Sequence, residues 1–178
     1  MATHNLSLGL DAEINHTISL LRSTSSKHPL SDELRLGPGA FFSIDPNGEV
    51  KGRCLTGGGD LLQLDYSVHR PVKWMALHLS MGGIDLRNAA VLGVVCKSQA
   101  PEATTFRFCL RSQAADGFRD AFLPKHVVAY AEASTHVDLL KLEGRDDVPA
   151  RSEWRDLILF FSPQSAVVKL MDLRVFVV

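Results

Sequence analysis

From residue 36 onward, the apolar residues of this chain recur at every second position. Apolar and polar residues alternate without a break over residues 62–68, and the same alternation returns over residues 75–81 and 106–111. Successive side chains of a β-strand point to opposite faces of its sheet, so each of these segments has one apolar and one polar face. The pattern predicts antiparallel strands that cover a core on one side and face solvent on the other.

Turns rich in glycine and proline separate these strands from others. The segment Asp45-Pro46-Asn47-Gly48 has the composition of a hairpin turn. Further strands are predicted at residues 40–44, 91–98, 126–133, 135–142, 154–162 and 167–178, and residues 49–53 could add a short one. A parallel α/β fold needs helices between its strands, and no second helix of convincing length follows residue 36. We therefore predict an all-β fold, an antiparallel two-sheet β-sandwich (jelly roll) of about ten strands with one N-terminal α-helix.

The apolar positions of these strands predict the composition of the core. Each strand should place one set of alternate residues between the two sheets. The residues expected there are Leu62, Leu64, Tyr66, Leu77, Leu79, Phe106, Phe108, Leu110, Leu157, Leu159 and Leu173.

Residues 10–22 have the spacing of an amphipathic helix. Leu10, Ile14, Ile18 and Leu21 follow one another at intervals of four, four and three, which places them on one stripe. This stripe could dock on the sandwich, the interpretation we favour, or pair with the helix of a second copy to form a homo-oligomer. The domain organisation expected is an N-terminal helical arm at residues 1–30 and a β-sandwich domain at residues 31–178.

Composition restricts the partners of the chain. The net charge is −1 over 178 residues, whereas nucleic-acid binding needs a surplus of lysine and arginine on one face. No segment approaches the ~20 apolar residues that span a membrane, and the N-terminus lacks the features of a signal peptide. We therefore expect a cytoplasmic protein that binds neither nucleic acid nor membrane.

The three cysteines predict buried thiols rather than a disulfide framework. Cys54, Cys96 and Cys109 form an odd set without metal-binding spacing, although Cys96 and Cys109 could pair if they lay on neighbouring strands. Cys109 lies between Arg107 and Arg111, whose charges would lower its pKa if the thiol were exposed. The interpretation we favour is an inert thiol.

Motifs for enzymatic chemistry are missing. The sequence has no GxSxG segment, and its histidines lie far apart, so neither a nucleophilic serine nor a close metal-binding pair is predicted. A dispersed site of His78, His126 and His136 is the weaker alternative. We expect no catalytic residue, no metal site and no cofactor, although Asp146 and Asp147 could contribute to a structural calcium site.

Acidic residues do not by themselves indicate a glycosidase. Cleavage of a glycosidic bond needs two carboxylates that face each other across the substrate. Asp65, Asp120 and Asp156 are candidates, but nothing in their spacing places any two of them together.

The order of turns and strands resembles the galactose-binding-like jelly roll, the fold of many carbohydrate-binding modules. The resemblance rests on the rhythm of the fold over residues 37–178, not on a diagnostic motif. The segments that carry it are a glycine-rich turn before an alternating strand (57–68), a strand opened by Trp74 (74–81), a Gly-Phe-Arg-Asp turn (117–120), a strand opened by Trp154 (154–159) and a closing strand (170–175). It implies saccharide binding on a sheet face or at loop ends, often beside a structural calcium, but it transfers no particular binding residue.

The alternation also predicts which polar residues face solvent, namely Gln63, Asp65, His78, Arg107 and Arg111. Polar side chains held on rigid strands suit sugar hydroxyls, and guanidinium groups suit a sugar carboxylate or sulfate. These five residues are therefore the predicted carbohydrate-binding site of a non-catalytic module. An acidic oligosaccharide is one ligand that this site would suit. The alternatives are an assembly protein that forms oligomers through the N-terminal helix and, less favoured, a jelly-roll lyase or hydrolase.

Overall fold

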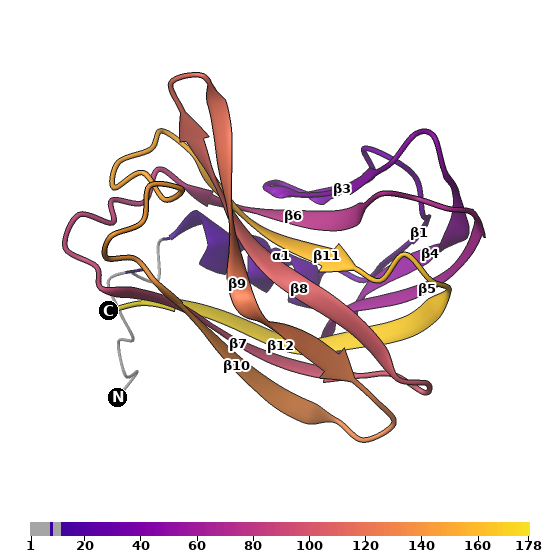
Figure 1. Cartoon of the computed structure of the whole chain (residues 1–178). Coiled ribbons are helices and arrows are strands. Elements are labelled where there is room, and N and C mark those ends of the chain that lie inside the picture. Colours follow the sequence, from indigo (N-terminus) through magenta and orange to yellow (C-terminus); the bar gives the residue numbers. More distant parts are fainter. Residues whose placement is uncertain (1–7, 9–11) are drawn as a thin grey trace.

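Two antiparallel sheets of six strands face each other in the computed structural model, which describes residue 8 and residues 12–178 (Figure 1). Sheet A has the strand order β1 (Ser26–Pro29), β4 (Glu49–Gly57), β5 (Asp60–Arg70), β12 (Ala166–Val177), β7 (Val91–Gln99) and β10 (Ser134–Lys141). Sheet B has the order β2 (Arg35–Gly37), β3 (Ala40–Ile44), β6 (Met75–Gly82), β11 (Arg155–Phe161), β8 (Thr104–Ala114) and β9 (Gly117–Ala129). The predicted fold class, a two-sheet β-sandwich with one helix, is confirmed.

The core lies between the sheets and contains the residues that the alternation predicts. All eleven predicted core residues are buried, and the most accessible of them, Tyr66, is 3% exposed. The Tyr66 hydroxyl donates a hydrogen bond of 3.0 Å to the carbonyl oxygen of Ser162, which satisfies its polar end. The apolar parity of each strand therefore decided correctly which side of the strand faces inward.

Helix α1 (Glu13–Ser23) packs on the sandwich. Its buried residues Ile14, Ile18 and Leu21 belong to the same core cluster as the sheet residues. The helix contacts β4 and β5 of sheet A and β6 and β2 of sheet B. Docking on the sandwich is thus confirmed for the described part of the stripe, while Leu10 lies outside the described residues. No helix in the described ranges is long and apolar enough to cross a membrane.

The domain boundary expected at residue 30 remains a prediction. The described segment before it packs on the sandwich and adds a strand to it. Besides α1, strand β1 pairs with β4, joining Ser26 to Thr56 and Pro29 to Arg53. Arg22 at the end of the helix forms an ion pair with Asp172 of β12. Residues 13–29 therefore contribute both to the core and to the edge of sheet A.

The sequence underestimates the number of strands. Strands β1 and β2 carry no apolar alternation, because β1 reads Ser-Lys-His-Pro and β2 has only three residues. The predicted turn at residues 117–120 is instead the start of β9, which pairs with β8 from Gly117 opposite Ala114. A hairpin connection of two residues, 115 and 116, replaces the longer turn that was expected.

All three cysteines are free and buried, as predicted. Cys54 and Cys96 lie on strands of sheet A, whereas Cys109 lies on β8 of sheet B. Cys96 and Cys109 do not pair, because they belong to different sheets and are both free. Burial raises the pKa of each thiol to about 12.

Candidate functional site

The five residues predicted to bind carbohydrate lie on the two opposite sheets. His78 is on β6, and Arg107 and Arg111 are on β8, all in sheet B. Gln63 and Asp65 are on β5 of sheet A. Alternation predicts which side chains of a strand face the core and which face outward. It does not predict which of the two sheets the strand joins. The structure therefore does not bring the five residues together around one groove.

The outer face of sheet B holds three of the predicted residues among several aromatic ones. In the sheet register, Phe41, His78, Ile158, Cys109 and Phe122 form one row across five neighbouring strands. The two flanking rows add Ala76, Phe160 and Arg107 on one side and Asp156, Arg111 and Asp120 on the other. We call these eleven residues the sheet B platform.

The middle of the platform is a closed apolar floor. Ala76, Cys109 and Ile158 are each 0% exposed and form a small cluster of their own, against which Phe160 packs. The Phe160 ring lies 5.4 Å from that of Phe122. Desolvation of the Cys109 thiol outweighs the charges of the two neighbouring arginines and raises its pKa to about 12, so very little thiolate forms near neutral pH.

His78 is buried in the platform rather than solvated. It is 6% exposed, and its ring stacks on Phe41 with centroids 4.5 Å apart and planes at 14°. Its Nδ1 lies 3.1 Å from Oδ2 of Asp156. The sequence predicted correctly that His78 points away from the core, but aromatic and acidic neighbours fix the ring in place.

Arg111 carries a charge that is already neutralised. Its Nε and Nη2 donate to the two carboxylate oxygens of Asp120, both at 2.7 Å, and its guanidinium lies 3.9 Å from the ring centroid of Phe118. The hydrogen bond from Arg111 to Asp120 raises the pKa of the arginine. Such a bidentate pair leaves Arg111 little capacity for a second anion.

Arg107 differs from Arg111 because no carboxylate within the described part of the chain forms an ion pair with it. Its guanidinium lies 4.6 Å from the ring centroid of Phe122, and its Nη2 donates to the carbonyl oxygen of Leu123 at 3.4 Å. Its Nε is buried without a hydrogen-bond partner. Arg107 is thus the arginine of the platform whose charge is not paired with a carboxylate of the described residues and whose hydrogen-bond donors are not all used.

The side of the platform next to β9 is open to solvent. Phe122 is 38% exposed, and Phe118, beside the platform, is 49% exposed. Helix α1 docks elsewhere, between strands of both sheets. The face therefore presents partly exposed aromatic rings next to guanidinium groups.

The acidic residues of the platform are engaged by bases. Asp120 pairs with Arg111, and Asp156 with His78. The third acidic candidate, Asp65, is on sheet A, where it accepts a hydrogen bond of 2.8 Å from Arg53. The structure thus offers no pair of free carboxylates among these three residues.

Metal-ligand geometry is likewise not found in the described ranges, residue 8 and residues 12–178, where no group of three His, Cys, Asp or Glu side chains could hold a metal ion. The three histidines considered for a dispersed site are divided between the sheets, because His78 and His126 lie in sheet B and His136 in sheet A. Of the two loop aspartates considered for calcium, Asp147 forms an ion pair with Arg145.

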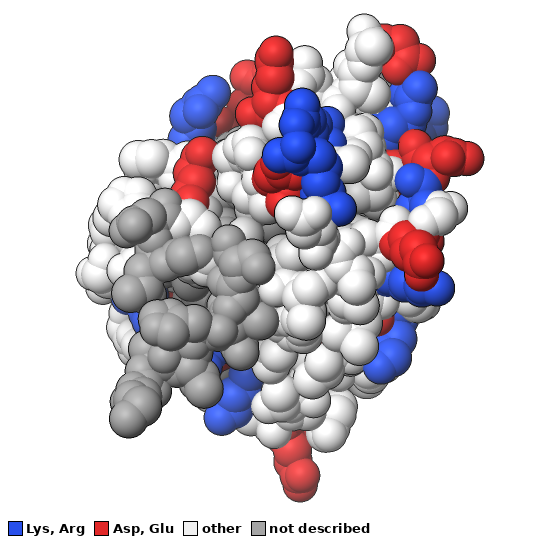
Figure 2. Space-filling model, turned by 90° about the vertical axis from the view of Figure 1, so that its left-hand side faces the viewer, with Lys and Arg blue, Asp and Glu red and all other residues white. Residues whose placement is uncertain are grey.

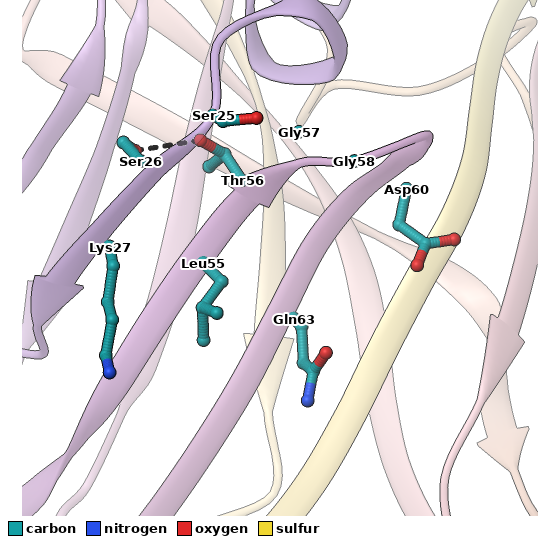
Figure 3. A pocket seen from close by; sticks show the side chains of 9 residues that line it. All are labelled: Ser25, Ser26, Lys27, Leu55, Thr56, Gly57, Gly58, Asp60 and Gln63. Carbon is teal, nitrogen blue, oxygen red and sulfur yellow. Dashed lines mark hydrogen bonds between the residues drawn. The ribbon is translucent and has the colours of Figure 1, made fainter.

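Sheet A carries a hollow that sequence reasoning did not identify as a site. It is lined by Gln63 together with residues of β1 and of the turn between β4 and β5, and its volume is about 550 Å³ (Figure 3). Elsewhere the surface alternates in charge, since Lys and Arg are interspersed with Asp and Glu on the face shown in Figure 2. The described residues on that face form no continuous basic patch for a phosphate backbone.

The aromatic residues of the platform were missed although a signal existed. Along the chain, the residues directly before and after Phe41, Phe122 and Phe160 are buried. Alternation alone could therefore have placed these three rings on the outer face. The two tryptophans, which drew attention as strand openers, lie outside the platform. Trp74 donates a hydrogen bond to Ser43 Oγ at 3.1 Å, and Trp154 is 38% exposed.

Comparison with known proteins finds similarity in structure alone. No protein-family model matches the sequence, and no curated protein matches it either. A CBM4 structure has a TM-score of 0.58 at 12% identity, covering 85% of this chain and 95% of that one. The family 11 carbohydrate-binding module from Clostridium thermocellum, in complex with a β-1,3-1,4-mixed-linked tetrasaccharide, has a TM-score of 0.56 at 10% identity, covering 86% and 97%.

The CBM22-1 xylan-binding domain of Xyn10C from Paenibacillus barcinonensis gives a TM-score of 0.51 at 11% identity, covering 88% of this chain and 96% of that one. These three similarities extend over nearly the whole length of both chains. They confirm the fold: the chain is a jelly roll of the type found in carbohydrate-binding modules.

Proposed function

We propose that this chain is a non-catalytic carbohydrate-binding module, and that its sheet B platform binds an acidic saccharide. The observation that carries the proposal is Arg107, a cation with no carboxylate partner in the described residues that stacks on the partly exposed ring of Phe122. A guanidinium suits a carboxylate or sulfate, and an aromatic ring suits the apolar side of a sugar. The fold similarity supports the proposal, because the solved structures include a xylan-binding domain and a module bound to a tetrasaccharide.

The two arginines have different roles in this proposal. Arg107 contacts the anionic group of the ligand, whereas Arg111 is held by Asp120 and keeps Phe118 and β9 in position. His78 and Asp156 hold each other and support the Phe41 side of the platform. The specificity for acidic sugars therefore depends on one residue rather than on two.

The test is calorimetry with a polyuronate, a sulfated polysaccharide and matched neutral polysaccharides. Arg107→Gln should weaken binding to the acidic polymers about tenfold to a hundredfold, since a hydrogen bond to a charged group contributes about 1.5–3 kcal/mol. It should leave the binding of neutral polymers unchanged. Arg174→Gln is the matched control, because Arg174 lies on sheet A and its side chain is 75% exposed. Equal affinities for acidic and neutral polymers, or an unaffected Arg107→Gln variant, would refute the proposal.

The assembly alternative loses the surface on which it depended. The described part of the helix stripe, Ile14, Ile18 and Leu21, is buried within the chain itself. A homo-oligomer would therefore need a different surface from the one that the sequence suggested.

A further inference from the structure

The hollow on sheet A is built by three neighbouring strands in register. Lys27 of β1 lies opposite Leu55 of β4, and Leu55 lies opposite Gln63 of β5. Figure 3 shows these three side chains projecting side by side from their strands, with Asp60 next to Gln63. The hollow thus combines an ammonium group, a carboxamide and the apolar surface of a leucine between them.

The turn from β4 into β5 lines part of the hollow and is held to the segment before β1. The hydroxyls of Ser26 and Thr56 lie 2.8 Å apart, and Thr56 Oγ1 donates to the carbonyl oxygen of Thr24 at 2.6 Å. Gly57 has a φ of 80°, and a Cβ built on it would lie 2.7 Å from Ser25 Oγ. Only glycine satisfies both the positive φ and this close approach, so the turn and the end of α1 are held together.

The charges around the hollow leave one cation without a partner. Asp60 pairs with Lys169 at 3.1 Å, and Asp65 pairs with Arg53 at 2.8 Å. Lys27 forms no ion pair with any residue of the described ranges. A ligand in the hollow therefore meets a net positive charge on the side of β1.

We propose that this hollow is a second saccharide site, which binds a hexuronate residue. The volume of about 550 Å³ lies within the range of small-molecule sites. Leu55 offers an apolar surface to the C–H groups of a sugar ring, and the Gln63 carboxamide can both donate to and accept from its hydroxyls. The ammonium group of Lys27 fits the sugar carboxylate.

This site is independent of the platform, because it lies on the other sheet. One molecule with both sites occupied would hold one chain on sheet B and another chain on sheet A. The inference extends the proposed function from a single-site module to one that bridges two acidic saccharide chains. The bridging rests on the proposed function, whereas the hexuronate site stands without it.

Nuclear magnetic resonance of the ¹⁵N-labelled full chain tests the site with D-glucuronate as the probe and D-glucose as its neutral match. Glucuronate should shift the side-chain amide signals of Gln63 and the backbone signal of Gly58, and glucose should shift them less. Lys27→Gln should weaken glucuronate binding about threefold to fivefold, the usual effect of one exposed charge pair. Lys27→Arg should bind as the wild type does, because it keeps the charge.

Lys97→Gln is the matched control, since Lys97 is an exposed lysine of sheet A outside the hollow. The Arg107→Gln variant should leave the Gln63 shifts unchanged even if the platform binds nothing, which separates failure of one site from failure of the other. The inference is overturned if Gln63 does not respond to glucuronate, if glucose binds equally well, or if Lys27→Gln and Lys27→Arg lose affinity equally. For the bridging, turbidity with a polyuronate should rise at a lower protein concentration with the wild type than with either Lys27→Gln or Arg107→Gln; the same turbidity curve with all three would overturn it.

Discussion

His78 lies face to face with Phe41 across β6 and β3, with ring centroids 4.5 Å apart. The imidazole is 6% exposed and also bonds to Asp156. We expect His78→Ala to lower the free energy of unfolding by about 2 kcal/mol, since it removes a stacked aromatic pair and leaves a carboxylate without its partner. Urea denaturation measures the change. His69→Ala, at an exposed position of β5, should change stability by less than about 0.5 kcal/mol, and equal losses in the two variants would contradict the assigned role.

Arg155 is a second buried polar residue, 0% exposed and without a carboxylate partner in the described chain. Its guanidinium donates to the carbonyl oxygens of Ile84 and Pro149 and to Ser112 Oγ, which joins two long loops to β8. We expect Arg155→Met to lower the free energy of unfolding by about 2–4 kcal/mol, because three acceptors lose their donor.

A milder substitution, Arg155→Lys, should have a smaller effect on stability than Arg155→Met. Arg155→Lys keeps the charge but can satisfy fewer of the three acceptors, so its loss should be smaller than that of Arg155→Met but measurable. Thermal and urea denaturation of both variants would test the order. If the methionine variant is as stable as the wild type, the hydrogen bonds of Arg155 are not needed to hold the two loops in place.

The buried thiols should be unreactive in the folded protein. Cys54, Cys96 and Cys109 each have a pKa raised to about 12 by burial, so almost no thiolate is present at pH 8. Titration with a disulfide reagent should detect no rapidly reacting thiol before denaturation and three after it. Fast modification of Cys109, between its two arginines, would contradict the burial of the platform floor.

Stability should fall in alkaline solution. The three thiols have a pKa of about 12 in the folded chain against an ordinary value of 9.0, and Tyr66 has a pKa of about 12 against an ordinary 10.0. Below pH 9 these groups are neutral in both states and the full stability is present. Between pH 9 and 12 the unfolded chain releases protons that the folded chain retains, so the free energy of unfolding decreases. Urea midpoints at pH 7, 9 and 10.5 should show a small decrease at pH 9 and a larger one at pH 10.5, and a flat profile would contradict the raised pKa values.

Strand parity predicted the fold well because burial between two sheets requires strict alternation. Leu62 and Leu64 had to face the core once β5 was recognised, and both are buried. β1 was missed because its place on the edge of sheet A depends on pairing with β4 and not on apolar residues of its own.

The predicted site was less successful because a site depends on which strands become neighbours. Asp65 and His78 are both correctly placed on outer faces, yet their strands belong to different sheets. The ion-pair partner of Arg111 could not be predicted either. Asp120 lies beside Arg111 because the two residues are opposite each other in the β8–β9 register. Pairing information of this kind is long-range, and local alternation does not contain it.

Strand β1 covers an edge of sheet A that would otherwise be open. It covers the backbone of β4, and at its end Pro29 has no N–H to offer to another strand. A fragment that begins at residue 31 would uncover the long edge of β4 and, through the loss of Ile14 and Ile18, part of the core. We expect such a fragment to join strands with its own copies, because β1 no longer covers the backbone of β4.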